Sequence, residues 1–493
     1  MIKRQKTRKE QTVLAQIRSA KTYTDWLSAQ TEWEALSGIH DWRGNTKRLK
    51  YDVHSYPYDA VKAHQHQLET ALKNKDSKSL LSNLTEGLYR LLNEINEPEL
   101  YTVSALGSKQ LTKDYFNTIS RCIDYLCLDK ALPYQGKINL LKAAQKNLGA
   151  PALMLSGGGT FGIYHLGVIK ALHEQHLIPD IICGTSMGSI AAGILATHND
   201  AELSALFNNT HQKDYAPLKK LAPQEMTKQT CLLDSQRLYD CIKSNIGNMT
   251  FAEAYKHTGR TVSITVSPTR HNQKPRILNH LTSPNVLIAY ASKASCSVPG
   301  LFPPVQLQQR VNNKQLAYCK EERWIDGSFA TDIPRQRMSR LFNVNFFIVS
   351  QANPHILPFV KAKQKKGLLP ALQDIATETL HAQSLAILNV LRRRNKHAFF
   401  RSWIDHCASM IDQDYQGDIN IHPTFPLKWY RKFMINPTND ELDYLIGLGE
   451  KATWPKISQI NEQTSLHRKL SKALTHLEKP QLSTIVNREL EFI

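Results

Sequence analysis

The residues that most clearly suggest a catalytic site surround Ser186. It stands in a G-x-S-x-G pattern between Gly184 and Gly188, after a short apolar run and before a stretch of small residues. This pattern predicts a sharp corner between a strand and a helix, with the serine hydroxyl exposed. The flanking glycines are needed because a side chain there would collide with the adjoining strand and helix. The corner therefore predicts a nucleophilic serine, with the positive end of the following helix favouring an oxyanion.

A second glycine-rich turn lies upstream of this serine. Residues 152–155 form an apolar run, and Gly157, Gly158 and Gly159 follow it before apolar residues recur at helical spacing. Glycines leave backbone N–H groups unobstructed, so these three residues can line an oxyanion hole that faces Ser186. Two successive strand–turn–helix units are therefore expected.

The first turn also fits G-x-G-x-x-G, the pattern of dinucleotide-binding loops, and Asp180 follows about 20 residues later. In a dinucleotide site the acidic residue ends the second strand, whereas Asp180 precedes it. The end of that strand is occupied by the serine corner. Nucleotide binding therefore remains only a minor alternative.

Two later aspartates are candidates for the base that activates the serine. A short run containing Trp324 and Ile325 predicts a strand that leads into Asp326, and Asp332 follows soon after. Apolar neighbours desolvate a carboxylate, which raises its pKa and makes it a better base toward a hydroxyl. The residues alone do not choose between Asp326 and Asp332.

A histidine base is the other possibility, since the chain has 19 histidines. His355, His381 and His422 lie downstream of both aspartates, and His165 lies on the helix after the glycine loop. None of them stands in a motif that marks it as catalytic. A two-residue site without histidine is therefore favoured.

Three motifs in this order resemble the patatin-like phospholipase family: SGGGTFG, GTSMGS and Asp326-Gly327-Ser328. The resemblance implies a three-layer α/β/α fold with a mainly parallel sheet and a Ser186–Asp326 catalytic dyad. It also selects Asp326 over Asp332 and implies that the glycine loop is the oxyanion hole. Thr160 is a departure, because many members carry a basic residue or alanine there. The loop acts through its backbone, so this difference leaves the expected chemistry intact.

The resemblance extends to nearly the whole chain. The segment with Trp26, Trp33 and Trp42 is similar to the N-terminal extension of the fungal and plant triacylglycerol lipases of this family. Residues 417–421 and 449–455 are similar to the same subgroup. This resemblance implies triacylglycerol or glycerophospholipid substrates, including lysophospholipids.

Composition and periodicity predict three consecutive parts. Residues 1–149 read as a helical N-terminal domain whose tryptophans anchor helix packing. Residues 150–350 read as the catalytic domain, in which the proline-rich loop 297–304 either walls an acyl-chain pocket or is a packed connection. Residues 351–493 read as a mostly helical extension.

Two stretches of this extension could contact lipid. A basic run at 361–366 precedes an amphipathic helix at 368–391 that ends in three arginines. Such a helix can lie at a membrane interface, although ordinary packing is favoured. Residues 429–433 combine aromatic and basic side chains, which suits lipid headgroups better than nucleic acid.

The chain of 493 residues carries a formal net charge of +19, with 41% hydrophobic and 21% charged residues. The excess of positive charge favours an anionic membrane or lipid-particle surface as a partner, or serves solubility alone; no nucleic-acid partner is expected. The eight cysteines are scattered and form no C-x-x-C pair, as in proteins of reducing compartments. No signal peptide and no membrane-spanning run is recognised, so a cytoplasmic, peripherally membrane-associated protein is expected.

Together these features predict a serine acyl hydrolase that cleaves carboxylic ester bonds of lipids, with acyl transfer as a conceivable side activity. The reaction requires no metal and no organic cofactor. The alternative is a non-catalytic lipid- or nucleic-acid-binding protein on the same fold. The oligomeric state is not predicted.

Overall fold

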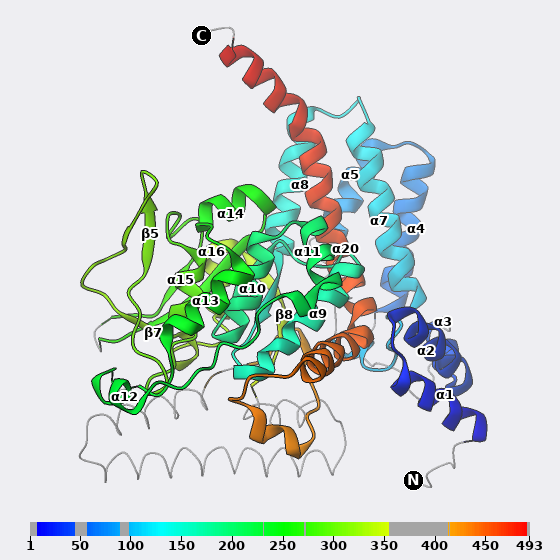
Figure 1. Cartoon of the computed structure of the whole chain (residues 1–493). Helices are drawn as coiled ribbons and strands as arrows, with labels where there is room; N and C mark the ends of the chain where they lie inside the picture. The colour runs from blue at the N-terminus through cyan, green and yellow to red at the C-terminus, as the bar shows by residue number, and fades with distance from the viewer. Residues whose placement is uncertain are drawn as a thin grey trace, which may run out of the picture. The chain divides into compact units, whose positions relative to one another are not determined.

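A computed structural model describes residues 7–44, 57–88, 98–229, 231–270, 273–353, 413 and 415–490 of the chain (Figure 1). Two compact units divide it: residues 1–151, 343–346 and 454–493 form the first, and residues 152–342 and 347–453 form the second. This grouping differs from the three consecutive parts that the sequence suggests. The region after 351 is shared between both units. The basic run at 361–366 and the helix expected at 368–391 lie outside the described residues.

The first unit is helical, as expected. Its helices are α1 (Arg8–Ser19), α2 (Tyr23–Ser37), α3 (Ile39–Gly44), α4 (Tyr58–Lys73), α5 (Ser77–Glu86), α7 (Gln110–Leu128), α8 (Tyr134–Leu148) and the part of α20 (Asn439–Leu490) from residue 454 onward. The three- and four-residue spacing of apolar residues in α5 places Leu80 and Leu84 in a buried core shared with residues of α4, α7 and α8. Trp26 and Trp42 are buried in this unit, which agrees with a packing role.

The second unit is built on a seven-stranded sheet of order β4-β3-β2-β1-β8-β9, with β7 paired to β3. The strands are β1 (Ala150–Leu155), β2 (Ile181–Gly184), β3 (Thr261–Pro268), β4 (Arg276–Leu278), β7 (Trp324–Asp326), β8 (Val344–Ser350) and β9 (Ile419–Ile421). A separate hairpin joins β5 (Gln308–Val311) to β6 (Lys314–Ala317). The mainly parallel sheet and its helices confirm the expected α/β class. The region predicted to be mostly helical nevertheless contains strand β9 in its described part.

The helices of this unit connect the strands (Figure 1). The connecting helices are α9 (Tyr164–Glu174), α10 (Met187–Thr197), α11 (Asp200–Asn208), α12 (Pro223–Gln229), α13 (Ser235–Ile246), α14 (Phe251–Thr258), α15 (Ile288–Ser295) and α16 (Arg335–Phe342), and the part of α20 before residue 454 follows β9. Helix α10 is buried along almost its whole length, which explains its run of small and apolar residues. Among the described residues, no helix is long and apolar enough to span a bilayer.

The strand register brings the two glycine-rich turns together. Strands β1 and β2 are parallel, with Leu155 opposite Gly184, and Gly184 lies opposite Ile264 of β3. Both turns therefore leave the same edge of the sheet at the same level. Strand β7 runs antiparallel to β3 and places Asp326 opposite Val266, two residues beyond that level. Functional groups of open α/β sheets gather at this edge, where the parallel strands end.

Candidate active site

Ser186 occupies a strained corner between β2 and α10. Its backbone angles are φ 50° and ψ −125°, a conformation that residues other than glycine rarely adopt. A Cβ atom at Gly184 would lie 2.2 Å from the carbonyl oxygen of Gly188, and one at Gly188 would lie 2.2 Å from that of Leu155. Only glycine fits at either position, because the strand and the helix approach so closely here.

Asp326 ends β7 and is only 1% exposed. Its Oδ1 atom accepts hydrogen bonds from the backbone N–H of Ser328 at 2.8 Å and from the Ser328 hydroxyl at 2.7 Å. Gly327 allows this turn to press against β3, since a Cβ atom there would lie 2.2 Å from the Thr265 hydroxyl oxygen. Burial raises the pKa of Asp326 to about 6, while the hydrogen bonds from Ser328 act in the opposite direction.

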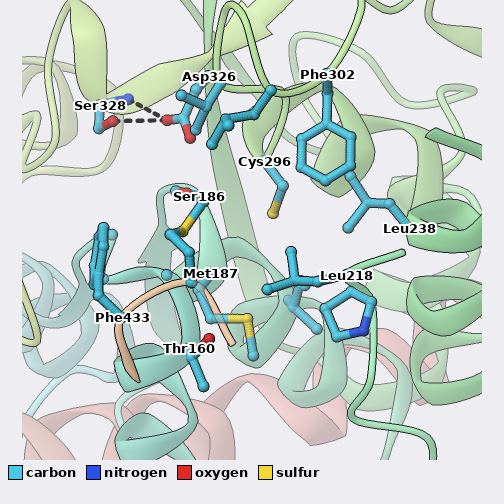
Figure 2. Close-up of a pocket in the computed structure, with 18 of the residues that line it drawn as sticks. Thr160, Ser186, Met187, Leu218, Leu238, Cys296, Phe302, Asp326, Ser328 and Phe433 are labelled. Carbon is cyan, nitrogen blue, oxygen red and sulfur yellow. Dashed lines mark hydrogen bonds between the residues drawn. The ribbon is translucent and has the colours of Figure 1, made fainter. Parts of the chain in front are cut away.

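The second carboxylate oxygen of Asp326 is turned toward Ser186. Figure 2 shows Asp326 above Ser186, with Ser328 holding the carboxylate from the far side. The Ser186 hydroxyl is near enough to favour the charged form of Asp326 and so to lower its pKa. No hydrogen bond of normal distance and angle joins them, so Oδ2 is buried without a partner in the described part of the chain. Catalytic hydrogen bonds are often loose before substrate binds.

Removing the Ser328 hydroxyl should change the acidity of this carboxylate. Ser328→Ala keeps the backbone N–H bond to Asp326 but loses the 2.7 Å bond from the hydroxyl. Because that bond stabilises the charged form, its loss should raise the pKa of Asp326 further. The acid limb of the pH profile of kcat/KM should move up by about one pH unit, which lowers activity roughly twofold at pH 7 and roughly fivefold at pH 6. A profile that overlaps the wild-type profile would show that Ser328 does not tune Asp326.

The glycine loop is less open than its sequence suggests. The N–H of Gly157 donates to Oδ1 of Asp332 at 2.8 Å, so this N–H already has an acceptor. The sequence predicts that the N–H groups of all three glycines are available to an oxyanion, whereas in the structure the N–H of Gly157 has another acceptor. The N–H groups of Gly158 and Gly159 donate to no group among the described residues, whereas that of Thr160 donates to the carbonyl of Phe433 at 3.1 Å.

The structure separates the two candidate aspartates by their contacts. Both oxygens of Asp332 are occupied, because Oδ2 accepts from the Asn353 side-chain amide at 2.6 Å while Oδ1 accepts from Gly157. Burial raises the pKa of Asp332 to about 7, and the nearby charge of Asp326 acts in the same direction. Asp326, by contrast, keeps one oxygen unpartnered beside Ser186.

No histidine is among the described residues that line the cavity at Ser186. His165 is fully buried away from it, where its ring contacts the Ser350 hydroxyl at 2.7 Å and the Ser156 carbonyl at 2.9 Å. Burial lowers its pKa to about 4, so it stays neutral at ordinary pH. His422 does not line the cavity, and His355 and His381 lie outside the described residues.

A cavity of about 540 Å³ opens in front of the serine, large enough for a drug-sized ligand. Its walls are strongly apolar, with Leu218, Leu238 and Phe302 on one side and Phe433 on the other (Figure 2). The apolar lining residues are Ile163, Met187, Ile190, Pro217, Leu218, Leu238, Cys296, Val298, Leu301, Phe302, Phe329, Phe433, Met434 and Pro437. The proline-rich loop 297–304 therefore forms part of the wall, as one of its two interpretations proposes.

Some of these residues carry no signal in the sequence. Phe433 belongs to the aromatic and basic stretch that suggests a lipid-headgroup contact, yet it lines the cavity and packs edge-on against Phe161. Trp429 of the same stretch stacks on Tyr444. Asn353 follows β8 and lines the cavity, and no motif in the sequence marks it. Among the described residues, no cluster of His, Cys, Asp and Glu could hold a metal ion.

Comparisons with known proteins agree with this architecture. Residues 153–337 match the patatin-like phospholipase family, and residues 2–146 match a domain of unknown function, DUF3336. The chain is 32% identical over 486 residues to triacylglycerol lipase ptl3 of Schizosaccharomyces pombe, with 94% of this chain and 97% of that protein covered.

Two further relatives are longer than this chain. Triacylglycerol lipase 4 of Saccharomyces cerevisiae is 30% identical, with 96% of this chain and 54% of that protein covered. Triacylglycerol lipase SDP1L of Arabidopsis thaliana is 30% identical, with 94% of this chain and 58% of that protein covered. The chain thus belongs to the patatin-like phospholipase family, in the subgroup with the N-terminal domain of fungal and plant triacylglycerol lipases.

Proposed function

We propose that this protein is a serine acyl hydrolase that cleaves carboxylic ester bonds of lipids by a Ser186–Asp326 dyad. One observation carries the proposal. A serine on a strained corner faces the unpartnered oxygen of a buried aspartate, at an apolar cavity of about 540 Å³. A hydroxyl nucleophile, a desolvated base and an apolar acyl site are the three parts that ester cleavage requires.

In the acylation step, Ser186 Oγ attacks the ester carbonyl carbon while Asp326 takes the hydroxyl proton. The negative oxygen of the tetrahedral intermediate accepts hydrogen bonds from Gly158 and Gly159, whose N–H groups have no described acceptor. One such donor is worth about 10²–10³ in kcat in comparable sites. The bond to the leaving alcohol then breaks, Asp326 returns the proton to that alcohol oxygen, and an acyl-serine remains.

In the deacylation step, Asp326 takes a proton from water, which attacks the acyl carbon. Collapse of the second tetrahedral intermediate releases the fatty acid and restores the Ser186 hydroxyl with the proton that Asp326 held. Another lipid alcohol in place of water would give acyl transfer. Gly157 shapes the loop rather than binding the oxyanion, because its N–H is donated to Asp332.

The substrate class follows from the cavity and from the relatives. The apolar walls suit a fatty acyl chain, and the relatives named above are triacylglycerol lipases. We therefore propose triacylglycerol as the first substrate and glycerophospholipids as the second. The net charge of +19 favours an anionic lipid surface as the place of reaction.

The test combines substrate ranking with identification of the nucleophile. Fatty-acid release is measured from triacylglycerol emulsions and from phospholipid and lysophospholipid vesicles, with and without anionic lipid. A fluorophosphonate that reacts with activated serines is then added, and the labelled peptide is identified by mass spectrometry. We expect release to stop as the label appears on Ser186. Release that continues after complete labelling, or a label on another serine, would contradict the proposal.

A further inference from the structure

Asp332 is a buried carboxylate to which the proposed mechanism gives no step. It is 1% exposed and does not line the cavity, yet it is bonded to residues beside both the nucleophile and the glycine loop. Burial of a carboxylate costs folding free energy, so a buried carboxylate near a reactive group is a candidate for a functional role. The hydrogen bonds of Asp332 indicate what this role is.

Asp332 connects the loops that follow three neighbouring strands. Its Oδ1 holds Gly157 after β1 at 2.8 Å, and its Oδ2 holds Asn353 after β8 at 2.6 Å. Its backbone carbonyl accepts the hydroxyl of Thr185, the residue before the nucleophile, at 2.7 Å. One residue thus ties together the glycine loop, the serine corner and the end of β8.

Its backbone N–H is held as well, since it donates to the side-chain oxygen of Gln413 at 2.7 Å. The side-chain nitrogen of Gln413 in turn donates to the carbonyl of Ser328, beside Asp326. Every polar group of Asp332 that can form a hydrogen bond is therefore engaged by a neighbouring loop. Such a connected, buried network fixes geometry because loss of one partner leaves another group unpaired.

We infer that Asp332 is a positioning residue, which holds the Gly157 N–H so that the next two N–H groups point at the reacting carbonyl oxygen. This inference rests on the proposed function. The peptide that carries the Gly157 N–H is also held at its other end, where the Ser156 carbonyl contacts the His165 ring at 2.9 Å, and the next carbonyl, that of Gly157, accepts the Ser156 hydroxyl at 2.8 Å. Without its acceptor on Asp332 the N–H of this peptide is buried and unpaired, so the peptide can tilt about its remaining carbonyl bond and displace the peptides that follow. A misplacement of about 1 Å can cost roughly 10²-fold in rate.

The decisive comparison is between Asp332→Ala and Asp332→Asn. Alanine removes both acceptors, so kcat should fall by about 10²-fold while KM changes less than about threefold. Asparagine keeps one oxygen for Gly157, and Asn353 can turn its amide to pair with the new NH2 group. Asp332→Asn should therefore stay within about tenfold of the wild-type kcat. Asn353→Ala leaves Asp332 in place and should give an intermediate loss.

Asp418 offers a matched control. Its carboxylate also accepts a backbone N–H, that of Phe347 at 2.7 Å, but it is exposed and outside the cavity lining. Asp418→Ala should leave kcat and KM at wild-type values. Thermal unfolding of every variant shows whether a loss of activity reflects a loss of folding.

A measurement that does not depend on catalytic activity completes the test. Hydrogen exchange of the peptide that spans Gly157 to Gly159 should be faster in Asp332→Ala than in wild type, and unchanged in Asp418→Ala. Equal loss of kcat in the alanine and asparagine variants, together with lowered melting temperatures, would reduce Asp332 to a structural role and overturn the inference. Unchanged kcat in Asp332→Ala would also overturn it.

The same experiments separate this inference from the proposed function. If wild type releases no fatty acid, or if the serine label falls elsewhere, the ester-hydrolase proposal fails. Unchanged exchange in Asp332→Ala would then overturn the claim that Asp332 holds the loop, and faster exchange would uphold it. If wild type is active through Ser186 but Asp332→Ala keeps the wild-type kcat, only the positioning role fails.

Discussion

Ser186→Ala is expected to lower kcat for lipid ester hydrolysis by about 10⁴-fold or more, with KM nearly unchanged. In the proposed mechanism the hydroxyl oxygen forms the acyl intermediate, so its removal leaves only the slower direct attack by water. Substrate binding should persist because the cavity walls are apolar side chains from other positions. The measurement is initial-rate release of fatty acid from triacylglycerol across substrate concentrations.

Folding of this variant needs a control, although alanine is close in size to serine. Ser186 is 9% exposed, and its backbone N–H, which donates to the Ser295 hydroxyl at 2.9 Å, is kept in the variant. The melting temperature should therefore stay within a few degrees of wild type. Activity that survives in well-folded Ser186→Ala would mean that another residue is the nucleophile.

The local parts of this site could be predicted from the sequence because each is a short-range pattern. Glycines on both sides of Ser186 specify the corner, since the close approach of β2 and α10 excludes any side chain. The pairing of β1 with β2 follows from two successive strand–turn–helix units. The two loops that carry Gly158 and Ser186 could thus be expected at one edge of the sheet.

The long-range parts could not be predicted in this way. The bond between Gly157 and Asp332 joins residues 175 positions apart, and no periodicity reports it. Strand β9 is only three residues long, too short for an alternating pattern to identify it within a region read as helical. Sequence chemistry alone could not rank Asp326 above Asp332. In the structure their hydrogen-bond partners differ, because Asp326 keeps an unpartnered oxygen whereas both oxygens of Asp332 accept hydrogen bonds.

Asp326→Asn is expected to abolish most activity and yet to stabilise the protein at alkaline pH. The variant cannot accept the Ser186 proton, so kcat should fall by about 10³–10⁴-fold. Its remaining carbonyl oxygen can still accept both bonds from Ser328. The buried negative charge is lost, however, and burial of that charge is what raises the pKa of Asp326 to about 6.

The sign of the pH effect follows from this raised pKa. A carboxyl whose pKa is higher in the folded state stabilises the fold below its unfolded pKa, and this contribution is lost as pH rises through about 6. By pH 8 the charged side chain costs wild type about 3 kcal/mol, a cost that the neutral asparagine side chain avoids.

The melting temperature of Asp326→Asn should therefore exceed that of wild type at pH 8, and the difference should shrink toward pH 5. Ser186→Ala, also inactive but still carrying the carboxylate, should keep a melting temperature that falls as pH rises, with the fall extended to somewhat higher pH because the hydroxyl no longer lowers the pKa of Asp326. A difference between Asp326→Asn and wild type that is constant from pH 5 to pH 8 would show that Asp326 is not held in this desolvated state.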